Sequence, residues 1–149
     1  MTNDRSQEKL GGSWIVDAGP DQMKTVTTYT PVGEGQYAAA EFAINFDWSL
    51  GGAKPTATHG STLTGVVEKT GSEIRFVLIS YALDRAEKAV YILKATGNKV
   101  FKDPDTINVI NLVLHVYDDP EHCNPVTDTA SFTIPETGTF PPVLEYRIK

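Results

Sequence analysis

The chain has 149 residues, a formal net charge of −6 and a single cysteine. The length suits one domain, residues 1–149, with a sizeable hydrophobic core. The acid excess and the scattered lysines argue against a nucleic-acid partner, and no apolar run is long enough to span a bilayer. Cys123 cannot form an internal disulfide, and the polar start "MTNDRSQEKL" lacks the apolar stretch of a secretory signal. We therefore expect a cytoplasmic protein without a membrane partner.

The predicted elements are almost all strands. Residues 1–11 are expected to form a short N-terminal helix or arm that Gly11 ends. Beyond them, β-branched and aromatic runs alternate with Gly, Pro, Asn and Asp, which is typical of strands. About nine strands are predicted, at residues 13–17, 24–30, 36–46, 61–69, 73–83, 89–96, 106–118, 130–134 and 142–149.

The short connections between successive strands favour an antiparallel meander. Eight or nine meandering strands can remove their free edges by closing into a barrel. The predicted fold is therefore an all-β, eight- to nine-stranded antiparallel meander β-barrel, with another β-barrel or a sandwich as the alternative. An eight-stranded barrel has room for packed side chains or for one small ligand.

The stretch "GSW", Gly12-Ser13-Trp14, resembles the Gly-x-Trp entrance of lipocalins and the wider calycin group. That resemblance implies that Trp14 closes one end of the barrel and that an arginine of the last strand covers it. Arg147, in "EYRIK", stands at the matching place. The mid-chain Thr-Asp-Tyr signature of the family is absent, and "SYALD", Ser80 to Asp84, is the nearest stretch. The chain is thus similar to an outlying, lipocalin-like domain.

Alternate loops of a meander lie at the same end of the barrel. Residues 18–23, 47–60, 84–88 and 119–129 should share one end, and they include the two longest loops. Long loops of this kind are usually functional or mobile. We expect an open mouth there that carries Trp48, His59, His122 and Cys123.

Alternation along each strand predicts which side chains point inward. In the third predicted strand the apolar Phe42, Ile44 and Phe46 share a face and should point inward, with Glu41 outside. The fifth strand should place Phe76 inside, and the sixth should place Tyr91 there. The fifth and seventh strands are apolar on both faces, which predicts a cover for their outer side. A homodimer through these two strands would supply it.

Few residues suggest chemistry. His115 shares a face with Asn111 and Tyr117, a set that could move a proton if it points inward, although a half-buried strand histidine is the ordinary interpretation. "DDPEHCN", Asp118 to Asn124, with His59 across the mouth matches no metal-binding spacing, and a solvated acidic loop is favoured over a zinc site. A nucleophilic role for Cys123 would need a base nearby, for which His59 is the one candidate. No metal or cofactor is expected.

The sequence suggests one leading function, and two other classes of function stay open. We expect a non-catalytic barrel that binds a small hydrophobic or aromatic molecule, in keeping with the ligands that the family resemblance implies. The expected ligand-binding residues are Phe42, Phe46, Trp48, Phe76, Tyr91 and His115. One rival is a cyclase- or isomerase-type enzyme, for which Glu41, Tyr91 or His115 would have to project into a closed pocket. The other is an interaction module whose barrel is filled by its own side chains.

Overall fold

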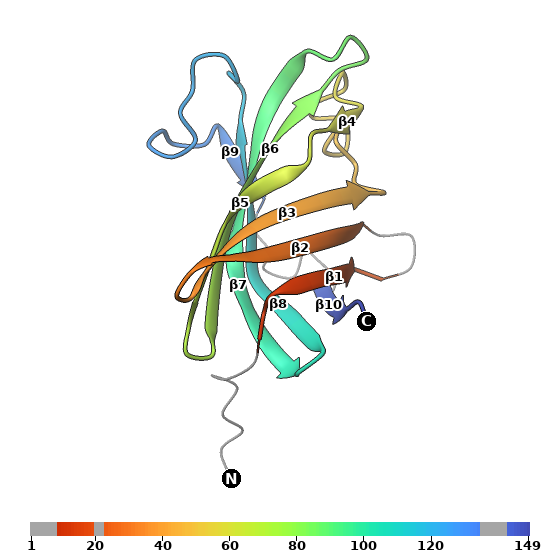
Figure 1. Ribbon diagram of the computed structural model, residues 1–149. Coiled ribbons are helices and arrows are strands. Elements are labelled where there is room, and N and C mark those ends of the chain that lie inside the picture. The colour runs from red at the N-terminus through yellow and green to blue at the C-terminus, as the bar shows by residue number, and fades with distance from the viewer. Residues whose placement is uncertain (1–8, 20–22, 135–142) are drawn as a thin grey trace.

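The computed structural model describes residues 9–19, 23–134 and 143–149, and within these ranges it holds ten strands and no helix (Figure 1). The strands are β1 (Gly12–Asp17), β2 (Lys24–Gly33), β3 (Gln36–Ile44), β4 (His59–Gly60), β5 (Leu63–Thr70), β6 (Glu73–Leu83), β7 (Ala89–Asp103), β8 (Thr106–Tyr117), β9 (Phe132–Ile134) and β10 (Val143–Arg147). The N-terminal helix or arm predicted for residues 1–11 lies mostly outside the described ranges. In the described part of the chain, no helix has the length and apolar character of a membrane span.

The strands form a closed antiparallel barrel of eight strands in meander order, as the sequence predicts. The neighbour order runs β1-β2-β3-β5-β6-β7-β8-β10, and β10 pairs back with β1 to close it. β8 is long enough to serve two partners. Its first half pairs with β10, from Thr106 to Val109, and its second half pairs with β9, from Leu114 to Val116. β4 pairs with the end of β6 and, like β9, lies outside the eight-stranded wall.

The inward and outward faces follow the alternation of each strand. β6 buries Ile74, Phe76 and Leu78, while Val77 is 45% exposed on the outer side. β7 likewise buries Tyr91 and Leu93. The predicted orientation of these two strands is confirmed.

Two features of the wall differ from the prediction. β3 has the opposite orientation: Ala39 is buried and Glu41 is mostly buried inside, whereas Phe42 is 63% exposed and Ile44 is 49% exposed outside. β7 continues to Asp103, well beyond the predicted end at Thr96. The predicted strand boundaries leave "GNKVFKDPD", Gly97 to Asp105, as a loop. Residues 97–103 extend the β7–β8 hairpin instead, with register shifts between Thr96 and Asn98 and between Phe101 and Asp103.

Trp14 and Arg147 close one end of the barrel, as the Gly-x-Trp stretch predicts. Trp14 is fully buried, and its indole N–H donates to the Leu10 carbonyl at 2.9 Å. The Arg147 guanidinium lies 4.3 Å from the centre of the Trp14 ring and donates to the Gly11 carbonyl at 3.0 Å. Trp14 and Arg147 are also register partners across β1 and β10. The first and last strands are thereby joined where the barrel closes.

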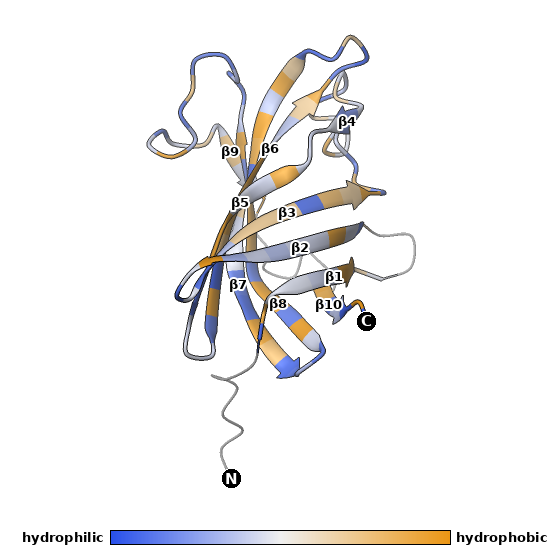
Figure 2. Ribbon diagram, viewed as in Figure 1, coloured by the Kyte–Doolittle hydropathy of each residue, from blue (hydrophilic) through white to orange (hydrophobic). Residues whose placement is uncertain are grey.

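One apolar row on the outer surface was not predicted. The register aligns Tyr146, Ile15, Val26 and Phe42 across β10, β1, β2 and β3. Each of these side chains is between 44% and 63% exposed. Figure 2 shows hydrophobic residues interspersed with polar ones along the strands of the wall. The row is a second outer apolar surface, separate from the outer face of β6.

Candidate functional site

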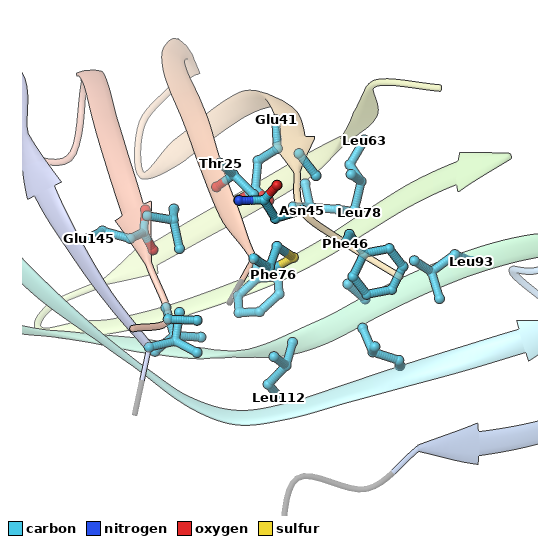
Figure 3. A pocket seen from close by; sticks show the side chains of 18 of the residues that line it. Thr25, Glu41, Asn45, Phe46, Leu63, Phe76, Leu78, Leu93, Leu112 and Glu145 are labelled. Atoms are coloured by element: carbon cyan, nitrogen blue, oxygen red, sulfur yellow. The ribbon is translucent and has the colours of Figure 1, made fainter. Parts of the chain in front are cut away.

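The barrel is hollow toward its other end. A cavity of about 360 Å³ lies between β1, β2, β3, β5, β6, β7, β8 and β10 (Figure 3). Trp14, Tyr29 and Phe101 fill the end at which Trp14 lies, so the cavity occupies the remainder. Its apolar lining is Val16, Ala18, Met23, Ala43, Phe46, Trp48, Leu63, Phe76, Leu78, Leu93, Ala95, Val109, Leu112, Leu114 and Val143. A cavity of this size and composition is typical of a small-molecule site.

The long loops gather at the open end of this cavity, which we call the mouth. It is formed by residues 45–58, 84–88 and 118–131, together with Ala18 and Met23. Lys54 pairs with Asp118 across two of these loops, and His59 Nε2 of β4, directly after the first loop, lies 2.9 Å from Glu87 Oε1 of the loop 84–88. Figure 1 shows the loop after β3 and the loop before β9 in the upper half of the view, away from the hairpin turns below. These contacts join three of the four loops predicted to share one end, whereas the fourth, residues 18–23, lies partly outside the described residues.

Trp48 covers part of the mouth. Its ring packs edge-on against Phe46, with the ring centres 4.8 Å apart, and it is 7% exposed. The Tyr91 hydroxyl holds the segment by donating to the Trp48 carbonyl at 2.7 Å. The ring also lies directly over Gly60 of β4, where a Cβ would come within 2.1 Å of it. Glycine is therefore required at this position for Trp48 to lie where it does.

A buried polar cluster borders the cavity at the depth of Phe76. Lys99 Nζ lies 2.6 Å from Glu145 Oε2 and 3.8 Å from Glu41 Oε1. The Tyr29 hydroxyl donates to Glu145 Oε1 at 2.6 Å and also contacts the Lys99 ammonium. That ammonium lies over the rings of Tyr29 and Phe76, at 4.9 and 4.8 Å from their centres. Glu41, Glu145 and Lys99 all line the cavity, together with Thr25, Asn45 and Asp47 as its other polar residues.

Burial sets the protonation of the cluster. It raises the pKa of Glu41 above its ordinary value, and the charge of Glu145 raises it further, while Lys99 opposes both. Burial also raises the pKa of Tyr29 well above its ordinary value, so its phenol keeps its proton. Glu145 is fully buried and has Lys99 and Tyr29 as close partners. The ion pair of Lys99 is therefore with Glu145, and Glu41 is the carboxyl group with the weaker compensation.

The six predicted ligand-binding residues divide into two groups. Phe46, Trp48 and Phe76 line the cavity, and Tyr91 lies behind them as the hydrogen-bond donor to Trp48. Phe42 does not belong to this set because its side chain lies outside the barrel. His115 is also outside the cavity lining, on the face opposite the buried Leu114 and Val116, with its Nε2 3.0 Å from the Thr96 hydroxyl.

The polar residues expected at the mouth do not form one site. His59 pairs with Glu87, and His122 pairs with Asp119 in its own loop at 3.0 Å. The described residues contain no group of His, Cys, Asp and Glu that could hold a metal ion. Burial raises the pKa of the Cys123 thiol, and nearby carboxylates raise it further, which disfavours the reactive thiolate.

Sequence reasoning missed the polar cluster. Lys99 has the same strand parity as Tyr91, Leu93 and Ala95, so extending β7 through Gly97 would have placed it inside. Glu41 was assigned to the outer face because Phe42 was assumed to point inward. No sequence signal marks Glu145. Its strand, β10, has five residues, Val143–Arg147, which is too short for the alternation of inward and outward side chains to be recognised.

Comparison with known proteins identifies no relative: neither a family model nor a curated protein nor a solved structure matches the chain.

Proposed function

We propose that this protein is a non-catalytic binding protein that takes a small, mostly apolar molecule into its barrel. The observation that carries the proposal is the cavity of about 360 Å³, lined mainly by apolar side chains and open toward the mouth. Removing apolar ligand surface from water contributes about 25 cal/mol per Å². The apolar lining therefore provides the affinity for an apolar ligand, and the few polar side chains of the cavity orient that ligand.

The proposal agrees with a lipocalin-like assignment, which we retain as part of it. The support is the closed meander barrel together with the contact between Trp14 and Arg147 at its closed end. We place the function in the cytoplasm, for which the single cysteine is the support. A module whose barrel is filled by its own side chains gains no support from a cavity of this volume.

Filling the cavity tests the proposal directly. Ala43 and Ala40 lie on the same strand, β3, but Ala43 lines the cavity and Ala40 is exposed outside. Ala43→Phe should abolish binding of the neutral fluorescent dye N-phenylnaphthylamine, whereas Ala40→Phe should leave it unchanged. The measurement is dye fluorescence in a titration of each variant. Equal dye binding by wild type and Ala43→Phe would show that the dye lies elsewhere and would contradict the proposal.

A second candidate, a cyclase- or isomerase-type enzyme, is favoured by one observation. Glu41 projects into the cavity, and burial raises its pKa, so it can keep a proton to give to a bound substrate. Incubating the protein in deuterated water with its copurified ligand tests this candidate. Deuterium incorporation into the ligand by wild type but not by Glu41→Gln would support an enzyme, and no incorporation by either would leave the binding protein.

A further inference from the structure

Carboxyl groups outnumber basic groups in the lining of the cavity. Three carboxyl groups, those of Glu41, Asp47 and Glu145, face a single ammonium group, that of Lys99. Asp47 lies at the mouth, where hydrogen bonds from Ser49 and Gly51 lower its pKa and keep it ionised. A ligand that enters therefore passes one carboxylate at the mouth and meets two carboxyl groups inside.

Lys99 is engaged by Glu145. Its Nζ is 2.6 Å from Glu145 Oε2, and it also contacts the Tyr29 hydroxyl, whereas Glu41 Oε1 is 3.8 Å away, beyond hydrogen-bond distance. Lys99 is 2% exposed and is held by these contacts and by the rings of Tyr29 and Phe76. Lys99 has little freedom to turn toward a new anion. A ligand carboxylate would therefore meet a lysine that is already paired with Glu145, and it would lie close to the carboxyl groups of Glu41 and Glu145.

Both carboxyl groups retain capacity to accept hydrogen bonds. Glu145 Oε2 is buried and has the Lys99 ammonium at 2.6 Å as its close partner, and its second lone pair faces no other donor among the described residues. Glu41 receives a hydrogen bond from Thr27 on β2, and its side chain is 12% exposed, toward the cavity. A group with several N–H donors and a positive charge matches what these oxygens lack.

We infer that the ligand is a cation, a protonated amine on a small apolar body, whose ammonium group pairs with Glu41 while the body packs against Phe46, Phe76 and Leu93. This inference rests on the proposed function. Figure 3 shows Glu145 at the left of the view, Glu41 near the top centre, and Phe46 and Leu93 to the right, so that such a molecule spans the cavity from the carboxyl groups to the apolar wall. Two cations then face the two inner carboxylates.

The environment of Glu41 predicts how affinity depends on pH. The groups that face Glu41 are Lys99 from β7, Glu145 from β10 and Tyr29, Thr25 and Thr27 from β2, with apolar Leu63 and Phe76 from β5 and β6. Because burial raises the pKa of Glu41, this group holds its proton to higher pH than an exposed glutamate does, and below its raised pKa an amine must displace that proton. Affinity for an amine should rise with pH until Glu41 is ionised, since the amine itself stays protonated across this range.

The test uses three probes that share one apolar body: octylamine, octanol and octanoate. Calorimetric titration at about pH 8 should give the tightest binding for octylamine, about tenfold weaker binding for octanol and none for octanoate. Glu41→Gln should weaken octylamine about tenfold and leave octanol unchanged, because the side chain keeps its shape and loses its charge. Glu73→Gln, the same change at an exposed residue of β6, should alter neither.

The outcomes separate the two proposals. If octanol or octanoate binds wild type as tightly as octylamine, the cation inference is wrong while the binding function stands. If Glu41→Gln keeps the full preference for octylamine, Glu41 is not its partner and the inference is again wrong. If none of the three probes binds the folded wild type, the proposed function fails and the inference fails with it. The ranking on wild type does not depend on the folding of any variant.

Discussion

Glu41 is the residue at which the chain departs most from a simple barrel core. The Glu41 carboxyl group lies inside the barrel beside the cavity. Lys99, the nearest cation, pairs more closely with Glu145. Burying a weakly compensated carboxylate is costly, and this cost raises the pKa of Glu41 by favouring its protonated form. This arrangement makes the stability of the empty protein depend on pH in a defined direction.

Glu41→Gln should remove that dependence. The pKa of Glu41 is raised above its ordinary value of 4.5, so the folded state binds more protons at this group than the unfolded chain does. Its contribution is fully present below the unfolded-state pKa and is lost as pH rises through the folded-state pKa. Relative to Glu41→Gln, wild type should lose about 1.4 kcal/mol of unfolding free energy per unit of pKa shift between about pH 4 and pH 8. Urea unfolding at both pH values measures it, and a constant difference would contradict the account.

Arg147 is the second residue with a defined energetic role. Its guanidinium covers Trp14, donates to the carbonyls of Gly11 and Pro104, and pairs with Asp105 at 3.2 Å. Arg147→Ala should lower the free energy of unfolding by about 2–3 kcal/mol. Arg147→Lys should recover part of that loss, because it keeps the charge but not the planar fork. Arg85→Ala, in the exposed β6–β7 turn, is the matched control, and an equal loss there would contradict the assigned role.

At the scale of elements, the sequence predicts strands better than it predicts their faces. β6 and β8 were placed closely because their long apolar runs end at turn residues. β3 was turned the wrong way because its largest apolar side chains, Phe42 and Ile44, were assigned to the interior. The interior at β3 instead carries Ala39, Glu41 and Ala43, since a cavity needs small side chains in its wall. Small inward side chains that line a cavity do not produce the hydrophobic alternation by which an inward face is recognised in a sequence.

β7 was cut short for a different reason. Gly97 and Asn98 resemble turn residues, but here they lie at a bulge in a continuing strand. A Cβ at Gly97 would lie 2.9 Å from the Phe76 ring, so this glycine makes room for a cavity-lining aromatic. Lys99 follows two residues later and therefore points inward beside the same ring. The polar part of the candidate site could not be predicted without the full length of β7. Its aromatic residues Phe46, Trp48 and Phe76 could be predicted.

The contact of β4 with the loop before it gives an element-scale prediction. Gly60→Ala would place a Cβ against the Trp48 ring, so Trp48 must move away from the mouth. We expect about tenfold weaker dye binding and a red shift of tryptophan emission as Trp48 becomes hydrated. Gly11→Ala is the control, since its Cβ would meet Pro31 at 3.6 Å and the Tyr29 carbonyl oxygen at 3.9 Å, both at ordinary van der Waals distance. Unchanged emission and affinity in Gly60→Ala would show that Trp48 does not depend on this contact.

At the scale of the whole molecule, exposed apolar side chains on the described strands include those on the outer face of β6 and those of the row across β10, β1, β2 and β3. Val77 and Tyr81 are 45% and 44% exposed on β6, and β7 separates them from the outer face of β8. The row formed by Tyr146, Ile15, Val26 and Phe42 is the other region. Exposed apolar surface of this kind often marks an interface.

We keep the proposal of a homodimer through the outer faces of β6 and β8. Sedimentation velocity at micromolar concentration should show a dimer for wild type and a monomer for Val77→Lys. Phe42→Lys, on the other region, should remain dimeric. A monomeric wild type would rule the dimer out, and dissociation by Phe42→Lys alone would move the interface to the row on β10, β1, β2 and β3.

The central claim is that the barrel is hollow and binds a small molecule inside. Native mass spectrometry of the gently purified protein, equilibrated with N-phenylnaphthylamine and compared with its denatured mass, tests this claim most directly. The account predicts an adduct of one dye or one copurified molecule per chain that leaves on denaturation and is missing from Ala43→Phe. Bare wild-type protein, or an equal adduct on Ala43→Phe, would contradict it.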